Sequence, residues 1–484
     1  MINVDTVMQQ SAAAFEQYKK VPAAGRAVFL ETIADELETL RESLVVIAGR
    51  ETNLPPARLN GELTRTTNQL KLFARLIREG SWVEAVIDSA NPASTPPRPD
   101  IRKMLMPVGP VVVFGASNFP FAFSTAGGDT ASVLAAGATA VIKGHPAHAE
   151  TSLQVFGAIE AAIRKTNMPA HTVQHVAQPG NTIGKELVMH PLTTGVGFTG
   201  SFQGGRALLG YANQRENPIP VFAEMSSVNP VVFLPDTLEK NAASLAQTFG
   251  GSVTLGMGQF CTNPGLLLGI RSAALDHFAQ LLGEAIAQCA PQKMLHAGIH
   301  EAYEKGRSQL LSQQGVAVVN QGAAAPAELE AHPVLARVDA KDFLANHLLQ
   351  EEVFGPSSLL IVCGDKEELK TVLKSLKGQL TTTVAGTEAD IAAYMDVVEL
   401  QTTLAGRVIL NAPPTGVEVC AAMVHGGPYP ATTDARFTSV GTSAIKRWVR
   451  PVCFQGFADN MLPDALKQDN PLGIWRLVDN EYRK

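Results

Sequence analysis

Cysteine is scarce in this chain of 484 residues, and no two cysteines are spaced like a metal-binding or redox motif. The five are Cys261, Cys289, Cys363, Cys420 and Cys453. They form no C-x-x-C pair, and none accompanies a closely spaced pair of histidines. An odd number of scattered cysteines argues against a disulfide framework and against a zinc site. We therefore expect free thiols, no bound metal and a cytoplasmic location.

Long apolar runs and runs of like charge are also missing. No apolar stretch reaches the roughly 18–20 residues that a membrane span requires, and residues 1–20 lack the pattern of a signal peptide. The formal net charge is only −6, and no run of five or more Lys or Arg occurs. These absences exclude polyanion binding, so we expect neither a nucleic acid nor a membrane as partner.

What is present is an α/β pattern in the middle of the chain. Apolar runs at 111–117, 138–144, 172–178, 193–200 and 219–224 are separated by helix-like stretches at 124–137, 148–166, 181–190 and 203–214. This alternation predicts a doubly wound, mostly parallel sheet. Ligands on such sheets bind beyond the carboxyl ends of the strands. Asn118, Lys143, Ser201 and Glu224 fall at or just after these ends, so we expect them along one edge of one sheet.

The flanking segments predict further domains. A chain of this length is expected to form about three domains. Helical patterns over 5–50, including a continuous stretch at 26–48, and over 60–85 precede the sheet. The proline-rich segment 89–100 interrupts regular structure before a short strand at 101–107. A second α/β region runs from 230 to about 410, and a strand at 447–455 follows a stretch rich in Gly, Pro and Thr.

Cys261 is the strongest candidate nucleophile. It lies in the turn-forming segment 256-GMGQFCTNPG-265, and Glu224 ends an apolar run upstream. A cysteine and a carboxylate base are the groups that form and then hydrolyse a thioester. Taken singly, each has an ordinary interpretation: packing for the cysteine, a solvated strand end for the glutamate, and a turn position for Asn118. Covalent catalysis therefore requires that the two side chains meet in space.

Seven segments, in the same order along the chain, resemble motifs of the aldehyde dehydrogenase superfamily. They are 117-SNFP-120, 140-AVIKGHP-146, 197-GFTGSFQGG-205, 223-AEMSSVNP-230, 258-GQFCTNPG-265, 351-EEVFGP-356 and 411-NAPPTG-416. The resemblance implies two doubly wound α/β domains, one for the cofactor and one for catalysis, with a small β-extension for oligomerisation. It also implies that the protein is an NAD(P)-dependent enzyme.

The implied boundaries divide the chain into three parts. Residues 1–88 and 108–224 would form the cofactor-binding domain, and residues 225–433 the catalytic domain. Residues 89–107 and 434–484 would form the oligomerisation hairpin and C-terminal segment. Because these last segments resemble the oligomerisation elements of the family, we expect a homodimer or homotetramer.

The same resemblance assigns the catalytic roles. Cys261 matches the nucleophile that attacks the aldehyde carbon, and Asn118 matches the side chain that stabilises the resulting oxyanion. Glu224 matches the general base that activates water to hydrolyse the thioester. Such a base works best with a pKa raised toward neutrality, and the apolar neighbours of Glu224 are expected to raise it.

Six further residues match the cofactor site. Lys143 matches the lysine that hydrogen-bonds the adenosine ribose, and Ser201 matches the serine near the pyrophosphate. Gly200 and Gly205 would permit close backbone approach. Glu352 and Phe354 match the residues that hold the nicotinamide ribose and pack beside the ring.

The sequence departs from the common family pattern in two places. Pro146 stands where many NAD-using members carry a glutamate, so nothing there repels a 2′-phosphate, and NADP is favoured over NAD. Lys185 and His145 are conceivable neighbours of that phosphate. The segment 425–441 replaces the usual proline-phenylalanine-glycine-glycine turn, so the substrate side of the site is expected to differ from that of common members.

The segments 114–137, 425–441 and 447–455 resemble one branch of the family, the α-ketoglutaric semialdehyde dehydrogenases. The implied reaction is oxidation of 2,5-dioxopentanoate to 2-oxoglutarate. Its distal carboxylate needs a cation, and Arg436 and Arg447 are candidates by location. One alternative is a fatty aldehyde dehydrogenase, with an apolar entrance supplied by Phe119, Phe121 and Phe123. Acyl transfer to CoA or phosphate and an inactive scaffold are two others.

Overall fold

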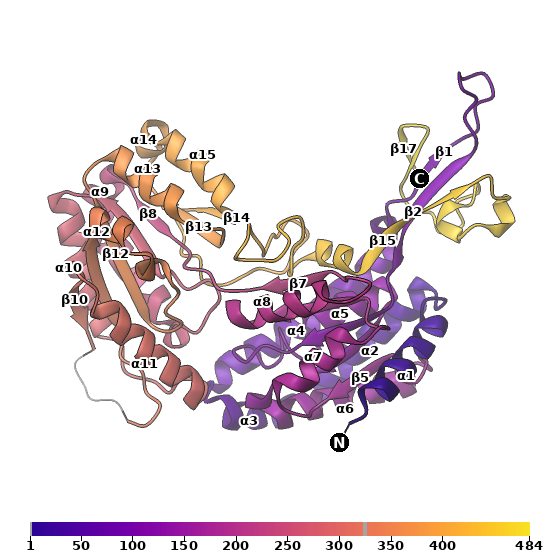
Figure 1. The fold of residues 1–484 in the computed structure, drawn as a ribbon, viewed down its shortest axis with the longest axis horizontal. Helices are drawn as coiled ribbons and strands as arrows, with labels where there is room; N and C mark the ends of the chain where they lie inside the picture. Colours follow the sequence, from indigo (N-terminus) through magenta and orange to yellow (C-terminus); the bar gives the residue numbers. More distant parts are fainter. Residues whose placement is uncertain (1, 323–326) are drawn as a thin grey trace.

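The computed structural model describes residues 2–322 and 327–484. The chain forms two α/β lobes and a smaller sheet that projects from one of them (Figure 1). The first lobe is built mainly from the N-terminal half of the chain, and the second from the segment between β8 and β14. The smaller sheet combines strands from near residue 100 with the C-terminal strands. This is the two-lobed architecture with a β-extension that the family resemblance implied.

The first lobe has five parallel strands in the order β5-β4-β3-β6-β7. They are β3 (Pro110–Phe114), β4 (Thr139–Lys143), β5 (Val173–Val176), β6 (Gly195–Thr199) and β7 (Val221–Glu224). The connecting helices are α5 (Gly128–Ala136), α6 (Ala149–Lys165), α7 (Asn181–Met189) and α8 (Phe202–Asn213). The predicted doubly wound sheet is confirmed, and its strand ends lie at one edge as expected.

Four N-terminal helices precede this sheet, namely α1 (Val4–Tyr18), α2 (Ala23–Thr39), α3 (Arg41–Thr52) and α4 (Pro56–Glu79). The continuous helix expected over 26–48 is broken at Leu40, and α4 ends at Glu79 instead of near 85. Gly80 causes the second difference. It adopts the left-handed conformation (φ 85°), which ends a helix and favours glycine.

The second lobe contains a seven-stranded sheet in the order β10-β11-β12-β9-β8-β13-β14. Its strands are β8 (Val231–Phe233), β9 (Leu266–Ile270), β10 (Ala317–Gln321), β11 (Val334–Asp339), β12 (Ser357–Cys363), β13 (Gln379–Ala385) and β14 (Ala405–Leu410). Only the β10–β11 pair is antiparallel among the described strands of this sheet.

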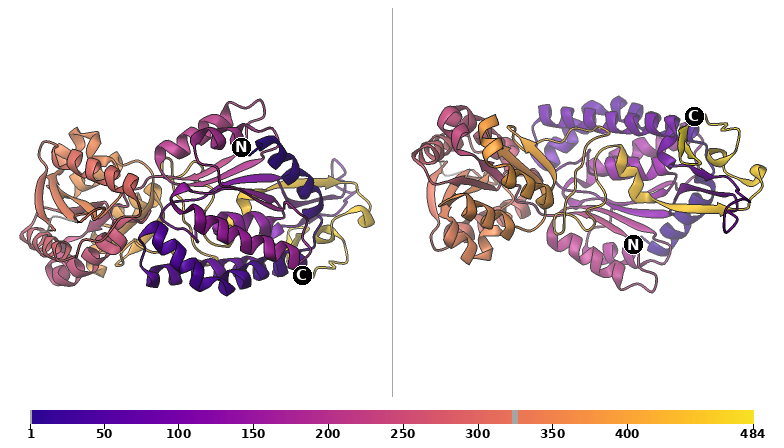
Figure 2. Two further views of the ribbon diagram at one scale, coloured as in Figure 1. Left: turned by 90° about the horizontal axis from the view of Figure 1, so that it is seen from below. Right: turned by 90° about the horizontal axis from the view of Figure 1, so that it is seen from above.

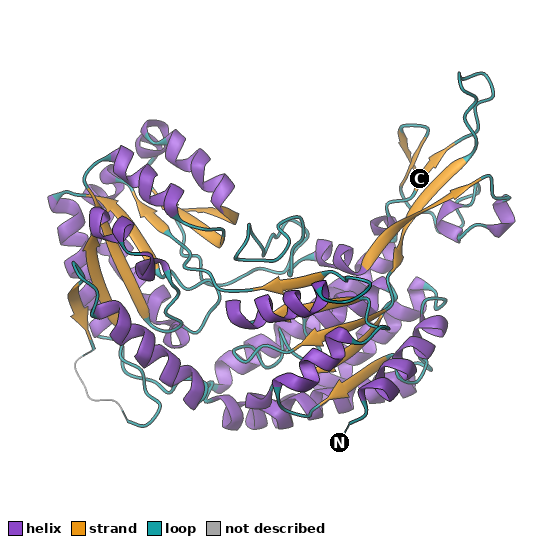
Figure 3. Ribbon diagram, in the orientation of Figure 1, coloured by secondary structure: helices purple, strands orange, loops and turns teal. Residues whose placement is uncertain are grey.

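Helices cover both faces of this sheet, as Figure 3 shows. They are α9 (Pro235–Thr254), α10 (Ala273–Ala287), α11 (Ala297–Leu311), α12 (Ala340–Ala345), α13 (Lys366–Ser375), α14 (Glu388–Ala393) and α15 (Met395–Leu404). Short 3₁₀ helices lie at Ser81–Val83, Pro146–His148, Leu255–Gly258, His347–Gln350, Thr442–Trp448, Asp459–Met461 and Asp464–Leu466.

The projecting sheet has the order β15-β2-β1-β16-β17. It comprises β1 (Val86–Asp88), β2 (Ile101–Pro107), β15 (Val449–Gln455), β16 (Arg476–Val478) and β17 (Glu481–Arg483). The C-terminal strand β15 pairs antiparallel with β2 of the same chain along its whole length. Because β1 pairs with β2 and β16, residues 86–88 belong to this sheet. The domain boundary expected at residue 88 had placed these residues in the cofactor-binding domain.

A long irregular segment returns from β14 across the front of both lobes to the 3₁₀ helix at Thr442–Trp448. It passes between the lobes in Figure 1 and is seen from above in Figure 2. Hydrogen bonds attach it to the edge strand β7, since Met225 N donates to Ala431 O (2.8 Å) and Thr433 N donates to Ala223 O (3.1 Å). This segment therefore reaches the carboxyl edge of the first sheet beside Glu224.

Within residues 2–322 and 327–484, no helix combines the length and the apolarity that crossing a membrane demands.

Two glycines, Gly80 at the C-cap of α4 and Gly61 inside it, predict stability changes of opposite sign. A Cβ on Gly80 would lie 2.7 Å from Ile474 Cγ2 in a left-handed conformation, so Gly80→Ala should destabilise the protein by about 1–2 kcal/mol or more. Gly61 lies inside the same helix with open space around its position, so Gly61→Ala should stabilise by about 0.5–1 kcal/mol. Denaturation midpoints of the two variants measure this, and shifts in the same direction would contradict it.

Candidate active site

The loop that carries Cys261 follows α9 and is held in an unusual backbone conformation. Gly256, Met257 and Gly258 all have positive φ. A Cβ on Gly258 would lie 2.2 Å from Gly355 O, so only glycine allows this close approach to the 351–356 segment. The loop and the segment that contains Glu352 therefore pack directly against each other.

Asn229 fixes the position of this loop. Its Nδ2 donates to the carbonyl oxygens of Cys261 and Asn263, both at 2.9 Å. Its own Oδ1 accepts hydrogen bonds from Ser227 and Thr381, also at 2.9 Å. A buried amide with this many partners holds the nucleophile in place. The sequence marked Asn229 only as part of a motif, and its positioning role emerges from the fold.

The structure brings Cys261 and Glu224 together, with a third group beside them. Cys261 Sγ lies 3.4 Å from His425 Nε2, and Glu224 Oε1 lies 3.0 Å from the same nitrogen. The three reactive atoms are all within 4.8 Å of one another. Ser439 Oγ donates to the other carboxylate oxygen of Glu224 at 2.6 Å. The geometric requirement for covalent catalysis is therefore met.

The same trio of thiol, carboxylate and imidazole has the ligand types of a metal site. The spacing of these three groups would also allow a metal ion. The absence of a bound metal therefore stays a prediction.

Burial and mutual charge set the ionisation of this cluster. Burial and the neighbouring charge of Glu224 raise the pKa of the Cys261 thiol well above its ordinary range, against the lowering effect of Arg65. Burial would also raise the pKa of Glu224, but His425, Ser439 and Cys261 together bring it below its usual value. The resting site thus pairs a neutral thiol with an ionised carboxylate.

The expectation of a raised pKa for Glu224 was therefore wrong in direction. Its apolar sequence neighbours suggested a desolvated, unpartnered carboxylate. The hydrogen bonds that reverse the shift come from residues 261, 425 and 439, which are far away in sequence.

Sequence reasoning missed His425 as a site residue. It is buried, and its backbone N–H donates to Thr438 Oγ1 (2.8 Å), which anchors the returning segment. The available signal was that His425 begins the segment 425–441 that departs from the common family pattern. A histidine in a segment peculiar to a subgroup is a reason to test it for a role at the site.

Asn118 reaches the nucleophile loop as expected. It is buried, and its Nδ2 donates to Gln259 O at 3.2 Å, two residues before Cys261. Its carbonyl oxygen accepts a hydrogen bond from Arg58 Nη2 at 2.9 Å. The side-chain amide retains a second N–H that can donate to an oxyanion near Cys261.

The three phenylalanines that follow Asn118 do not act as one apolar entrance. Phe121 is fully buried in the core of the first lobe. Phe119 and Phe123 contact each other, with ring centroids 5.3 Å apart, and Phe119 also contacts Phe260 (5.6 Å) next to Cys261. Arg58 lies over the ring of Phe119 (4.7 Å), so this wall of the site is aromatic and basic.

The two arginines considered for a substrate carboxylate are both engaged elsewhere. Arg447 is buried and forms an ion pair with Asp129 at 2.7 Å. Arg436 is exposed and pairs with Asp434 at 2.6 Å. Both guanidinium groups are thus paired within the protein, which argues against either candidate as the partner of a substrate carboxylate.

The residues expected to hold the adenosine half of a cofactor lie at the carboxyl edge of the first sheet. Lys143 ends β4, is buried, and donates to Gly144 O at 2.9 Å. Ser201 is the N-cap of α8, where its hydroxyl accepts from Gly204 N. Gly200 and Gly205 flank it, and a Cβ on Gly205 would lie 2.7 Å from Met225. A lysine, a serine and a helix N-terminus suit ribose and pyrophosphate groups.

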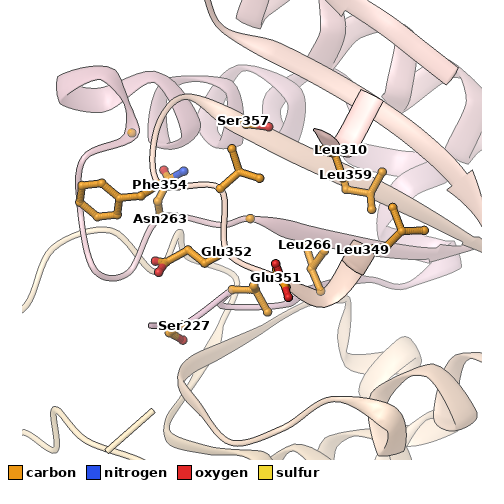
Figure 4. Close-up of a pocket in the computed structure, with 14 residues that line it drawn as sticks. Ser227, Asn263, Leu266, Leu310, Leu349, Glu351, Glu352, Phe354, Ser357 and Leu359 are labelled. Atoms are coloured by element: carbon orange, nitrogen blue, oxygen red, sulfur yellow. The ribbon is translucent and has the colours of Figure 1, made fainter. Parts of the chain in front are cut away.

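Glu352 and Phe354 come from the second lobe and line a pocket beside the Cys261 loop. Figure 4 shows both side chains on the same side of the pocket as Asn263, opposite the apolar side chains of Leu310 and Leu359. Burial raises the pKa of Glu352 to about 7, against hydrogen bonds from Ser226 and Ser227 that lower it. A carboxylate and a ring at this point suit a ribose and an adjoining flat ring.

Comparison with known proteins shows the family of the chain. Residues 2–429 match the Aldehyde dehydrogenase family. The chain is 49% identical over 480 residues to α-ketoglutaric semialdehyde dehydrogenase 2 of Azospirillum brasilense, covering 99% of this chain and 91% of that protein. It is 47% identical over 478 residues to α-ketoglutaric semialdehyde dehydrogenase of Acinetobacter baylyi, covering 98% and 90%.

Solved structures share the fold at low sequence identity. Glyceraldehyde-3-phosphate dehydrogenase GapN of Methanocaldococcus jannaschii, complexed with NADP, superimposes with a TM-score of 0.79 at 20% identity, over 93% of both chains. The chain spans less than half (46%) of a longer match, proline utilization A of Bdellovibrio bacteriovorus, at the same TM-score. Together with the thiol and carboxylate found in contact, these matches establish that the chain belongs to the aldehyde dehydrogenase family.

Proposed function

We propose that this protein oxidises 2,5-dioxopentanoate to 2-oxoglutarate with a nicotinamide cofactor, through a thioester on Cys261. The observation that carries the proposal is the contact of Cys261, Glu224 and His425 at one point between the lobes. Two relatives at 47–49% identity bear the name of α-ketoglutaric semialdehyde dehydrogenase. Glu224 then lies beside the thioester as a base that can activate water for hydrolysis. Acyl transfer to CoA or phosphate would not need such a base.

In the first step Cys261 attacks the aldehyde carbon. The thiol is neutral at rest because its pKa is raised by burial and by Glu224, so its proton must leave as the bond forms. Glu224 is ionised and stands close enough to accept it, and His425 Nε2 lies 3.4 Å from the sulfur. The attack creates an oxyanion, to which Asn118 Nδ2 and the backbone N–H of Cys261 donate. Losing one such donor typically costs about 3–4 kcal/mol.

When bound, the cofactor accepts the hydride, and the protein is left as a thioester at Cys261. Lys143 and Ser201 would hold its adenosine and pyrophosphate groups, and Glu352 and Phe354 its nicotinamide side. After it has released the thiol proton to solvent, Glu224 takes a proton from water, and this water attacks the thioester, releasing the carboxylate product and the thiolate of Cys261. His425 and Ser439 keep Glu224 ionised for this step through their hydrogen bonds.

For the cofactor we propose NADP, with NAD also accepted. Pro146 is exposed directly after the segment that carries Lys143, and it offers no carboxylate to repel a 2′-phosphate. His145 does not supply a cation there, because burial lowers its pKa to about 3 and keeps it neutral. Lys185, the other conceivable neighbour of that phosphate, has its Nζ 5.3 Å from the centroid of the Tyr211 ring.

We also propose a homodimer or homotetramer in the cytoplasm. The projecting sheet and the segment after β15 expose large apolar side chains, including Met461 (69%), Trp475 (50%) and Tyr482 (77%). Apolar groups gathered on a protruding element favour burial against a second subunit. The five cysteines are all free, as in a reducing compartment.

Replacing the base should separate the two halves of the reaction. Glu224→Gln is expected to lower the steady-state rate by about 100-fold or more, because water is no longer activated. A burst of about one reduced cofactor per active site should remain, as measured by stopped-flow absorbance, but it should form more slowly than in the wild type because the thiol has lost the carboxylate that can accept its proton. Glu239→Gln, an exposed glutamate of α9, is the control and should behave as the wild type. Full steady-state activity of Glu224→Gln would refute the role.

Replacing His425 should move the acidic limb of the pH profile. His425 lowers the pKa of Glu224, so His425→Asn raises it, and Glu224 becomes protonated at a higher pH than in the wild type. The acidic limb of kcat/KM against pH should therefore shift to higher pH. The exposed His171, which has a positive φ that asparagine tolerates, supplies the control His171→Asn. An unchanged profile in His425→Asn would contradict this coupling.

A carboxylate at position 146 should disfavour NADP. Pro146→Glu is expected to lower kcat/KM for NADP by about tenfold or more relative to NAD, because a like charge faces the 2′-phosphate. Pro146→Gln removes the proline without adding charge and should keep the wild-type ratio. Equal ratios in both variants would show that the phosphate lies elsewhere.

A further inference from the structure

The guanidinium of Arg65 has no partner although it lies in the wall of the active site. Arg65 projects from α4 and lies over the ring of Phe123, with 5.1 Å between its Cζ and the ring centroid. Its Nη1 is buried without a hydrogen bond, and within residues 2–322 and 327–484 no ion pair or hydrogen bond reaches this side chain. A buried cation without a partner is unfavourable unless an anion joins it.

Arg65 is separated from the reacting atoms by one aromatic ring. The ring of Phe123 lies 6.3 Å from that of His425, whose Nε2 is 3.4 Å from Cys261 Sγ. The positive charge of Arg65 also lowers the pKa of the Cys261 thiol, against the larger raising effects of burial and Glu224. The chain of contacts from Arg65 through Phe123 and His425 to Cys261 therefore places this guanidinium on the Phe123 side of the reacting atoms.

The other two arginines near the site are occupied. Arg58 Nη2 donates to Asn118 O at 2.9 Å, and its Cζ lies 4.7 and 4.5 Å from the ring centroids of Phe119 and Phe260. Arg407 donates to the carbonyl oxygens of Gly416 (3.0 Å) and Pro414 (2.6 Å). Arg58 Nη1 and Arg407 Nε also lack a partner, but the other nitrogens of these two guanidinium groups bond to the protein, whereas among the described residues Arg65 has no hydrogen bond at all.

The anions around Arg65 do not satisfy it. Glu62, on the same helix, accepts hydrogen bonds from the backbone N–H groups of Phe121 (2.8 Å) and Ala122 (3.0 Å), and it lies 3.9 Å from Arg58. Glu224 is bonded to Ser439 and lies beside His425. Glu418 is the third carboxylate whose charge acts on Arg65, but it is exposed to solvent and forms no ion pair with Arg65 among the described residues. A free carboxylate from outside is therefore the group that Arg65 lacks.

We propose that Arg65 binds the carboxylate at the far end of the substrate and thereby selects aldehydes with a terminal carboxylate over plain alkanals. This inference rests on the proposed function and adds the residue that gives its specificity. A guanidinium presents paired N–H donors that match a carboxylate. Phe119 and Phe123 would pack along the carbon chain between the carboxylate and the aldehyde.

The test compares two aldehydes of equal chain length, 2,5-dioxopentanoate and pentanal, in wild type and Arg65→Met. Loss of the Arg65 charge raises the pKa of the Cys261 thiol. The oxidation of both aldehydes should therefore become slower by the same factor. The ratio of their kcat/KM values cancels this factor and reports on the contacts to the far end of the substrate, namely the carboxylate and the adjacent keto oxygen that pentanal lacks. We expect that ratio to fall by about 10- to 100-fold, mainly through KM for 2,5-dioxopentanoate.

Two variants control for charge and for folding. Arg65→Lys keeps the charge but not the paired donors, so its ratio should lie between those of Arg65→Met and wild type. Arg436→Met removes an exposed arginine outside the site and should leave the ratio unchanged.

The outcomes separate this inference from the proposed function. If the wild type does not prefer 2,5-dioxopentanoate to pentanal, the substrate assignment fails and the inference fails with it. If the wild type has the preference and Arg65→Met keeps it, only the assignment to Arg65 fails. An equal loss for both aldehydes, with the ratio intact, would show that Arg65 serves the thiol or the structure alone.

Discussion

The contact between Glu224 and His425 is the interaction on which the active site depends. Glu224 ends a strand of the first lobe, and Cys261 is carried by a loop of the second. His425 belongs to the returning segment, which is attached to β7 through Ala431 and Thr433. Because the imidazole nitrogen lies against both the carboxylate and the sulfur, the contact fixes the relative position of the two lobes where the chemistry occurs.

Opposing electrostatic effects keep this buried cluster stable and reactive. Burial raises the pKa of the thiol and would raise that of Glu224, but the charge of His425 and the hydrogen bonds from His425, Ser439 and Cys261 together outweigh burial at Glu224. The aromatic and basic wall formed by Phe119, Phe123 and the arginines of α4 adds positive charge on the side where an anionic substrate would lie. One cluster thus holds a neutral thiol, an ionised base and an open cationic position.

The amino-acid pattern was sufficient for the fold class and for much of the site. Alternating apolar runs and helical stretches predicted the parallel sheet, because strands buried on both faces read as short continuous apolar runs. The turn-forming neighbours of Cys261 and the strand-end position of Glu224 are local properties, so they could be read without a structure. Element ends were less accurate, as at Leu40 and Gly80, because helix termination there depends on caps and on packing with distant segments.

The roles of His425, Asn229 and Arg65 could not be read from the pattern, because each acts on residues far away in the chain. His425 reaches Glu224 across 201 residues through a segment without regular structure, and Asn229 holds a loop 32 residues ahead. The same reason accounts for the wrong direction of the Glu224 pKa, and it explains why location in the sequence could only name Arg436 and Arg447 as candidates, without showing that both are paired. Short-range preferences set where strands and helices form, whereas the pairing of buried charges is settled when the lobes pack together.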